Sequence, residues 1–387
     1  MNLGSRIRGC AGALVVSALA FQSPAAGQAR QPVDKAVAIP TPADDTLWYD
    51  IRQVDIEGKG WQDTEHFYDR LPSRAKGVVR EPVWNIGQRS AGLCARFMTD
   101  SAAIKVRWSL RMERLGLNDM SAGGMSGLDL YIRNDGGGWE WVGHAAPTQF
   151  GTNTREIVAG LNPGWHEFLL YLPLYNGVES VEIGIPASMS LSKAAERRQK
   201  PIAVYGTSIT EGGDASRPGM AYTAILGRRL DRPVINLGFS GNGPMEIEVG
   251  RFLKELDVAV FVLDCLPNMD AAQVKQRAVP FVKLLREAQP QTPIVLVENI
   301  VYQGSRYMAE RRESAASKNA ALEAAYQELI ANGVQKLFYI PGASLLGDDG
   351  EATVDGTHPT DLGFFRMADA MEPVWRQALA AATGDSR

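Results

Sequence analysis

The second half of the chain alternates short apolar runs with longer amphipathic stretches, and few folds fit this pattern. The apolar runs have the continuous composition of strands that are buried on both faces. They lie at 202–205, 234–237, 258–263, 294–297 and 337–340, and stretches of helical periodicity lie at 222–230, 246–256, 272–288, 306–331 and 361–381. This alternation predicts an α/β fold, a parallel sheet with helices on both faces, whose ligands bind beyond the carboxyl ends of the strands.

The first half has a different sequence pattern, in which short segments of alternating apolar and polar residues, typical of strands, are separated by turns. Residues 93–98 and 104–108, for example, flank a polar turn at 99–101 and predict a hairpin. Repeated strands of this kind predict an all-β, jelly-roll-like sandwich over residues 48–190. We expect a charged linker at 191–200 to join this sandwich to the α/β domain at 201–384.

The N-terminus has the features of a secretory signal. Arg6 and Arg8 precede an apolar run at 10–21, and Gly27-Gln28-Ala29 fits a cleavage site of small residues. We therefore expect a signal peptide at 1–29, a flexible leader at 30–47, and export to the periplasm or the cell exterior. An uncleaved anchor is the alternative, but the run is too short to cross a bilayer, which takes about 18 or more apolar residues. We therefore predict no stable membrane anchor.

Charge and cysteine content exclude several classes of protein. The net charge is −4, and removal of residues 1–29 takes two arginines and no acidic residue, which brings it to −6. A chain of this charge lacks the broad basic face of a nucleic-acid-binding protein. No Cys/His cluster has zinc-ligand spacing, and we predict neither a metal nor a cofactor. Cys94 and Cys265 remain after cleavage; they could pair, but buried free thiols are favoured because the two lie in different predicted domains.

A serine follows the first predicted strand of the α/β domain directly. The run at 202–205 leads into Gly206-Thr207-Ser208, and the glycine permits a sharp turn that exposes the Ser208 hydroxyl beyond the sheet edge. This position suits a nucleophile. The alternative is that Ser208 only caps the next helix, the commoner role of a serine after a strand.

Only one of the four histidines lies in the α/β half. His66, His144 and His166 fall in the predicted sandwich and are interpreted as structural or surface residues. His358 follows the last strand, in Asp355-Gly356-Thr357-His358-Pro359. An aspartate three residues earlier can hold the imidazole in the tautomer that a general base needs. The alternative is an Asx turn at Asp355 and a helix cap at His358.

Two further loops offer hydrogen-bond donors at the same edge of the sheet. Gly241 follows the second strand and Asn268 follows the third. The Gly241 N–H and the Asn268 amide can converge beside Ser208, where an oxyanion would need them.

Residues 201–382 resemble the SGNH, or GDSL-like, hydrolases, which are serine esterases with a flavodoxin-like three-layer α/β/α fold and are named for four sequence blocks. The resemblance implies that Ser208 is the nucleophile and an oxyanion donor through its own N–H, and that Gly241 and Asn268 are the other donors. It also implies that Asp355 and His358 complete a triad. The first block has Thr207 where aspartate is commoner, and the third, at 266–269, keeps Asn268 but lacks the family's glycine and the aspartate that follows the asparagine.

Gly127-Leu128-Asp129-Leu130-Tyr131 resembles the Gly-x-Asp-Leu-Tyr signature of a sandwich module that precedes some SGNH domains. The combined resemblance implies a serine esterase that hydrolyses carboxylic esters, acetyl esters above all, on a small molecule or a glycan, with a carbohydrate favoured; the signal pattern adds that it is exported. An acyltransferase with the same triad is one alternative. Another is a non-catalytic glycan-binding protein with a degenerate SGNH domain, which the altered third block favours and the intact triad disfavours. The sequence sets no oligomeric state.

Other side chains admit two interpretations each. Seven of the eight tryptophans lie between Trp48 and Trp165, which suits either a sugar-binding platform or a core. For Trp139 and Trp141, on one strand face, core packing is favoured. Asp264 and Glu298, at strand ends, suit either substrate binding or hydrogen bonds to a loop.

Overall fold

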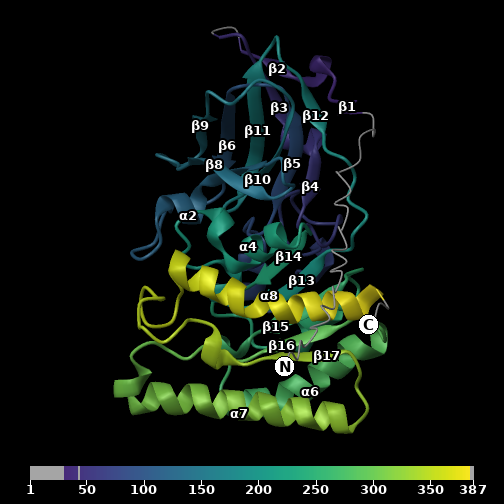
Figure 1. Cartoon of the computed structure of the whole chain (residues 1–387), viewed down its shortest axis with the longest axis vertical. Helices are drawn as coiled ribbons and strands as arrows, with labels where there is room; N and C mark the ends of the chain where they lie inside the picture. The colour runs from purple at the N-terminus through teal and green to yellow at the C-terminus, as the bar shows by residue number, and fades with distance from the viewer. Residues whose placement is uncertain (1–29, 42–43, 384–387) are drawn as a thin grey trace, which may run out of the picture.

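The computed structural model describes residues 30–41 and 44–383, in which a β-sandwich lies against a layered α/β domain (Figure 1). The signal peptide expected at 1–29 lies outside the described residues. Within the described part of the chain, no helix has the length and apolarity needed to cross a membrane.

The five apolar runs form one parallel sheet, as predicted. Its strands are β13 (Ile202–Gly206), β14 (Val234–Gly238), β15 (Val260–Asp264), β16 (Ile294–Val297) and β17 (Leu337–Ile340). They lie in the order β14-β13-β15-β16-β17, with every pair parallel. The first strand in sequence therefore has neighbours on both sides, and the direction of winding reverses there. Such a switch point is where open α/β sheets bind their ligands.

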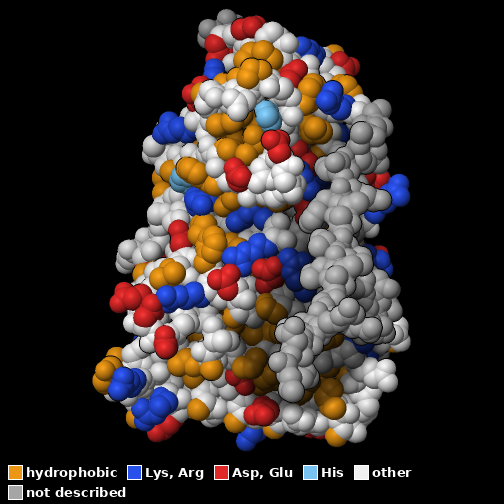
Figure 2. Space-filling view, in the orientation of Figure 1, with side chains coloured by type: hydrophobic (Ala, Val, Ile, Leu, Met, Phe, Trp, Pro, Cys, Tyr) orange, Lys and Arg blue, Asp and Glu red, His pale blue; other side chains and the backbone are white. Residues whose placement is uncertain are grey.

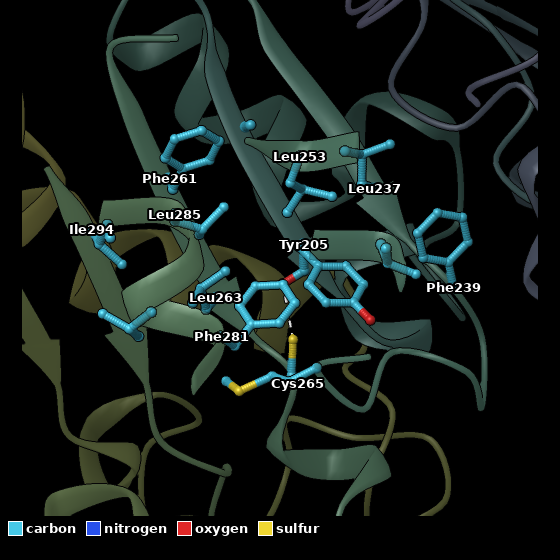
Figure 3. Packing of buried hydrophobic residues seen from close by; sticks show 14 of the residues in the cluster. Tyr205, Leu237, Phe239, Leu253, Phe261, Leu263, Cys265, Phe281, Leu285 and Ile294 are labelled. Atoms are coloured by element: carbon cyan, nitrogen blue, oxygen red, sulfur yellow. Dashed lines mark hydrogen bonds between the residues drawn. The ribbon is translucent and has the colours of Figure 1, made fainter. Parts of the chain in front are cut away.

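Helices cover both faces of this sheet. They are α3 (Ser208–Glu211), α4 (Tyr222–Arg229), α5 (Ile247–Leu253), α6 (Ala271–Ala288), α7 (Ala309–Ala331) and α8 (Asp361–Thr383). Alternate strand residues point to opposite faces, so Ile202 and Val204 pack with α4 and α8, while Ala203 and Tyr205 pack with α5 and α6. In the second of these cores the Tyr205 and Phe281 rings stack with centroids 5.6 Å apart (Figure 3).

Two antiparallel sheets form the sandwich. One contains β1 (Gln31–Pro32), β12 (Leu191–Lys193), β5 (Cys94–Thr99), β10 (His166–Tyr171), β7 (Leu128–Arg133) and β8 (Trp139–Ala145), with β4 (Asp55–Glu57) beside β5. The other contains β2 (Ile39–Pro40), β3 (Thr46–Asp50), β11 (Val178–Pro186), β6 (Ile104–Leu110) and β9 (Thr152–Val158). Their inner faces share one apolar core, in which Trp108 and Phe97 are fully buried.

Three details of the sandwich differ from the prediction. The hairpin is wrong, because β5 and β6 belong to different sheets and the turn between them crosses the sandwich. The expected flexible leader contributes β1 and β2, which pair with β12 and β3. The expected linker starts with β12, a strand of the sandwich. β1 and β12 gain backbone hydrogen bonds from strands that are distant in sequence, which local composition does not reveal, whereas β2 pairs with the nearby β3.

Most of the buried apolar side chains of residues 58–90, a segment expected in the sandwich, pack on the α/β sheet instead, and Tyr68 packs in the sandwich core. This segment includes α1 (Glu81–Gly87), and its side chains Trp61, Leu71 and Trp84 are buried in the same core as Leu237 and Phe252. Two of the tryptophans that suggested a sugar platform are therefore core residues of the α/β domain. The first half of the chain builds part of the second domain.

The sandwich also contacts the α/β domain through the Gly-x-Asp-Leu-Tyr segment. The fully buried Asp129 carboxylate, on β7, accepts hydrogen bonds from the Gly219 N–H at 2.8 Å and from Arg217 at 2.7 Å. Charged side chains of both signs also gather across the middle of the molecule (Figure 2). At the junction, Arg133 and Arg197 both form ion pairs with Asp231 at 2.8 Å. Cys94 and Cys265 are free and buried.

Candidate active site

Ser208 is the first residue of α3, immediately beyond β13. The N-cap of that helix is Thr207, whose hydroxyl accepts a hydrogen bond from the Ile209 N–H at 3.3 Å. The helix cap is therefore filled by the neighbouring residue. The Ser208 Oγ instead lies 2.8 Å from Nε2 of His358. The turn is tight, since a Cβ on Gly206 would lie 2.0 Å from the Thr210 hydroxyl oxygen.

His358 and Asp355 form the rest of the chain of contacts. The Asp355 Oδ2 lies 2.8 Å from Nδ1 of His358, and its Oδ1 accepts the backbone N–H groups of Thr357 and His358 at 2.8 and 2.7 Å. The Asx turn proposed as an alternative is thus present as well. Partial burial raises the pKa of Asp355, but the hydrogen bonds from His358 and Thr357 together outweigh it and hold the pKa below its usual value. The carboxylate is ionised and fixes the imidazole orientation.

A second carboxylate, not singled out from the sequence, faces the same imidazole. The Asp214 Oδ2 lies 3.9 Å from Nδ1 of His358, its side chain is 5% exposed, and its backbone φ is +69°. Burial, followed by repulsion from Asp119, raises its pKa to about 6, although the attraction of His358 opposes the shift. The only sequence signal is the pair of glycines before Asp214, which permits a sharp turn directly after α3.

The two donor loops lie together at the carboxyl edge of the sheet. Asn268, in a short 3₁₀ turn after β15, accepts the Gly243 N–H through its Oδ1 at 3.1 Å. Because the oxygen is used there, the remaining hydrogen-bonding group of this amide is the donor Nδ2. Gly241 has φ +68° and open space around the position of a Cβ, so its backbone is accessible. The loops are therefore joined by a hydrogen bond and keep donors available.

The remaining candidates have structural contacts. Asp264 is buried and accepts hydrogen bonds from Thr210 at 3.0 Å and Tyr222 at 2.8 Å. Glu298 accepts from the Tyr339 hydroxyl at 2.6 Å and the Gly342 N–H at 2.7 Å. Asp264 therefore connects α3 and α4 to the end of β15, and Glu298 connects the end of β16 to β17 and the turn after it. Trp141 is 50% exposed, so the prediction that it packs in the core is wrong.

The other histidines lie outside this cluster, in the first half of the chain. His66 contacts Asp69 at 3.3 Å, and His166 contacts the Asn162 carbonyl at 3.0 Å. Within residues 30–41 and 44–383, no group of three or more His, Cys, Asp or Glu side chains is placed to hold a metal ion.

Taken together, the contacts can support nucleophilic chemistry. A hydroxyl, an imidazole and a carboxylate are linked in series at 2.8 Å each, with donor loops on the same sheet edge. An imidazole in this position can take the hydroxyl proton as the oxygen attacks a carbonyl carbon.

Two family profiles match the chain. The GDSL-like lipase/acylhydrolase family matches residues 199–376, and the GxDLY N-terminus of SGNH-hydrolase-type esterases matches residues 46–191. No curated protein sequence matches.

Several solved structures are similar over both halves. A protein assigned as a GDSL-like lipase, from Bacteroides ovatus, is 35% identical with a TM-score of 0.82, over 86% of this chain and 98% of that one. A salicylyl-acyltransferase from a tetracycline biosynthetic pathway is 19% identical with a TM-score of 0.69, over 88% and 98% of the two chains. A family two carbohydrate esterase from Clostridium thermocellum, in complex with cellohexaose, is 14% identical with a TM-score of 0.56, over 75% and 94%. At 19% and 14% identity, the last two similarities show a shared fold and nothing more.

Proposed function

The chain belongs to the GDSL-like lipase/acylhydrolase (SGNH) family and carries its GxDLY N-terminal module, and we propose that it is a serine esterase. We propose further that it removes acetyl groups from carbohydrate. The observation that carries the proposal is the series of contacts from the Ser208 hydroxyl through His358 to Asp355.

The proposed reaction proceeds through an acyl-enzyme. The Ser208 oxygen attacks the ester carbonyl carbon while Nε2 of His358 takes its proton. The oxyanion accepts hydrogen bonds from the N–H groups of Ser208 and Gly241 and from the Asn268 side chain. The carbonyl re-forms as the C–O bond to the alcohol breaks, and His358 returns the proton to the leaving oxygen. Water then cleaves the acyl-enzyme by the same steps and releases the carboxylic acid.

Two observations support a carbohydrate substrate. The histidine side of the site is open, with side-chain exposures of 29% for His358 and 42% for Asp355, which suits an ester on a large polar molecule. Among the proteins with a similar fold is a carbohydrate esterase solved with cellohexaose.

An acyltransferase is the second candidate, because a salicylyl-acyltransferase shares the fold over both domains. The two reactions share the acyl-enzyme and differ in what attacks it, water or an acceptor alcohol. When an acceptor alcohol is added, a transferase should release the alcohol of the original ester faster. A new ester should then form in place of the free acid.

The test is acetate release from p-nitrophenyl acetate and from a panel of acetylated glycans, with and without added sugar acceptors. We expect acetate from at least one glycan, and no activity in the variant Ser208→Ala. Full activity of Ser208→Ala would overturn the mechanism. Activity on p-nitrophenyl acetate alone would leave the mechanism standing and remove the carbohydrate substrate.

We also propose that the protein is exported, from the sequence pattern at residues 1–29. Cell fractionation should find the mature protein outside the cytoplasm, with its N-terminus near Arg30. A cytoplasmic, full-length product would refute this.

A further inference from the structure

The end of the nucleophile helix is held by side chains from the first half of the chain. Glu211, the last residue of α3, is fully buried. Its Oε1 contacts Arg70 at 3.3 Å and Arg89 at 3.2 Å, and its Oε2 accepts the Ser240 N–H at 3.0 Å. One carboxylate thus connects the helix that starts with Ser208 to the residue before Gly241.

Arg70 holds the base of the same donor loop. Besides Glu211, its guanidinium donates to the carbonyl oxygens of Asn236 and Gly238, at the end of β14, at 3.1 and 2.8 Å. It also donates to the backbone carbonyl oxygens of Ile86 at 2.9 Å and of Arg89 at 3.0 Å. All five N–H donors therefore have acceptors, so the plane of this buried group is fixed.

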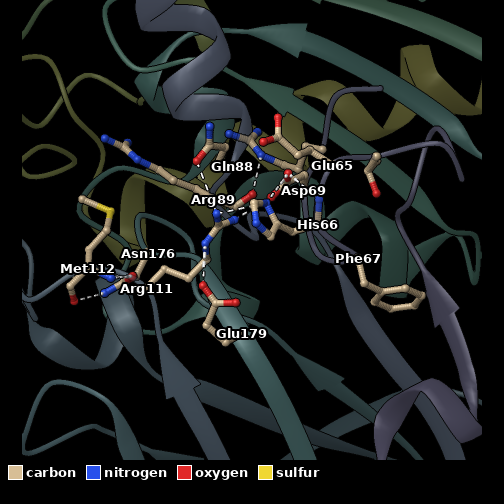
Figure 4. A network of polar contacts seen from close by, with 12 residues as sticks. Glu65, His66, Phe67, Asp69, Gln88, Arg89, Arg111, Met112, Asn176 and Glu179 are labelled. Carbon is tan, nitrogen blue, oxygen red and sulfur yellow. Dashed lines mark hydrogen bonds and ion pairs between the residues drawn. The ribbon is translucent and has the colours of Figure 1, made fainter. Parts of the chain in front are cut away.

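The surroundings of Arg70 are fixed in turn. The neighbouring Asp69 side chain is 1% exposed and accepts a hydrogen bond from Arg111 at 2.7 Å. Arg111 follows β6 of the sandwich and also pairs with Glu179 at 3.0 Å (Figure 4). The network therefore reaches from the sandwich to the end of the parallel sheet.

Tyr175, in the loop between β10 and β11, contacts the nucleophile itself. Its buried hydroxyl donates to the Ser208 backbone carbonyl at 3.2 Å. The guanidinium of Arg89 lies 4.9 Å from the centre of its ring, which connects this contact to Glu211. The first half of the chain therefore reaches the nucleophile turn by two routes.

We propose that Arg70, Arg89 and Tyr175 are positioning residues. They act through Glu211 and the Ser208 carbonyl to hold the nucleophile turn and the Gly241 loop in fixed positions relative to each other. On this proposal, which rests on the proposed function, the first half of the chain completes the catalytic centre. The reason is geometric: oxyanion stabilisation requires donors fixed relative to the attacking oxygen, and the contacts of Glu211 join these two elements.

The test compares full-length Tyr175→Phe and Glu211→Gln with the control Glu167→Gln. Tyr175→Phe removes one hydroxyl and leaves no buried charge behind. Glu167 also pairs with an arginine, Arg96, at 2.5 Å, but both residues lie on strands of the sandwich. Active sites are counted by the p-nitrophenol released when diethyl p-nitrophenyl phosphate phosphorylates the enzyme, so that kcat refers to competent molecules.

We expect kcat per titrated site for p-nitrophenyl acetate to fall about 10-fold in Tyr175→Phe and about 100-fold in Glu211→Gln, with KM nearly constant. Glu167→Gln should lower Tm and leave kcat per site unchanged. A lowered Tm with wild-type kcat per site in both test variants would mean a structural role alone and would overturn the proposal. Wild-type enzyme without esterase activity or phosphorylation would overturn the proposed function, and this inference with it.

Discussion

The Ser208 side of the candidate active site, which we call the nucleophile side, is buried and packed from several directions, whereas the His358 side is a surface loop. Ser208 is 7% exposed, and beside it a Cβ on Gly243 would lie 2.0 Å from the Gly206 carbonyl oxygen. Asp355 is 42% exposed, and its contacts come from residues two and three positions along the chain. The proposed attacking group thus depends on contacts from several parts of the fold, while the proposed proton acceptor depends on one short turn.

This difference predicts where substitutions act. Changes on the buried side should disturb folding and activity together, because interiors are close-packed and relax little. Changes on the exposed side should alter catalysis with little loss of stability.

Gly238→Ala and Gly241→Ala, only three residues apart, contrast the packed and open parts of the donor loop. A Cβ at Gly238 would lie 2.1 Å from the Glu211 backbone nitrogen, whereas a Cβ at Gly241 meets nothing within 4 Å. Gly238→Ala should yield little folded enzyme and no measurable kcat. Gly241→Ala keeps its N–H and should cost about 1–2 kcal/mol of stability, from its left-handed backbone, with kcat within several-fold of wild type. Thermal unfolding and esterase assays measure the Tm and kcat of the two variants. Equal Tm and equal kcat would contradict the contrast between a packed and an open part of the loop.

Asp355→Asn should lower kcat about 1,000-fold. Asparagine keeps an acceptor for the two backbone N–H groups but removes the charge opposite Nδ1, and a buried triad aspartate loses about 10⁴-fold in the same change. The smaller expected loss reflects solvation of the exposed side chain. Tm should change little. Asp361→Asn, at an exposed carboxylate that accepts from Ser216 at 3.0 Å, is the control and should keep wild-type kcat. A loss of kcat below 10-fold in Asp355→Asn would mean that Ser208 and His358 act as a dyad without Asp355.

Asn268→Ala should lower kcat about 100-fold, equivalent to about 3 kcal/mol in the barrier, through loss of one oxyanion donor. Asn268→Asp separates this role from the contact with Gly243, because the carboxylate keeps an oxygen for the Gly243 N–H. The aspartate variant should be as impaired as the alanine variant, or more. Wild-type kcat in Asn268→Asp would exclude the amide from the oxyanion hole.

The sequence predicts the parts of this architecture that are local. Continuous apolar runs located all five parallel strands within two residues, and Asp355 and His358 contact each other because they share one turn. The placement of residues 58–90 was missed, since the segment has one short helix and no clear periodicity. Arg70 was missed because its acceptors, such as Gly238, lie far away in sequence. The hairpin was wrong because turn residues do not specify which sheet the next strand joins.

Asp214→Asn tests the contact between the two sides, because this buried carboxylate follows α3 and faces His358, and it has the smallest expected effect. The Asp214 carboxylate stands 3.9 Å from Nδ1 of His358, and its pKa is raised to about 6 by burial and by the nearby Asp119 and Asp355 carboxylates, against the attraction of His358. Above pH 6 its negative charge stabilises the imidazolium that forms during attack, by about 1 kcal/mol, the value for this distance when solvent screens the pair through the imidazole, which is 29% exposed. The variant should therefore have kcat roughly five-fold below wild type at pH 8.

At pH 5 wild-type Asp214 is protonated, so the two enzymes should have similar kcat, and their ratio should change with a midpoint near pH 6. Stability should follow the opposite trend. The folded pKa lies above the ordinary value of 3.8, so wild type loses stability relative to the variant as pH rises from about 4 to 6. A kcat ratio independent of pH would mean that the Asp214 charge does not act on His358, and the charge at Nδ1 would then come from Asp355 alone.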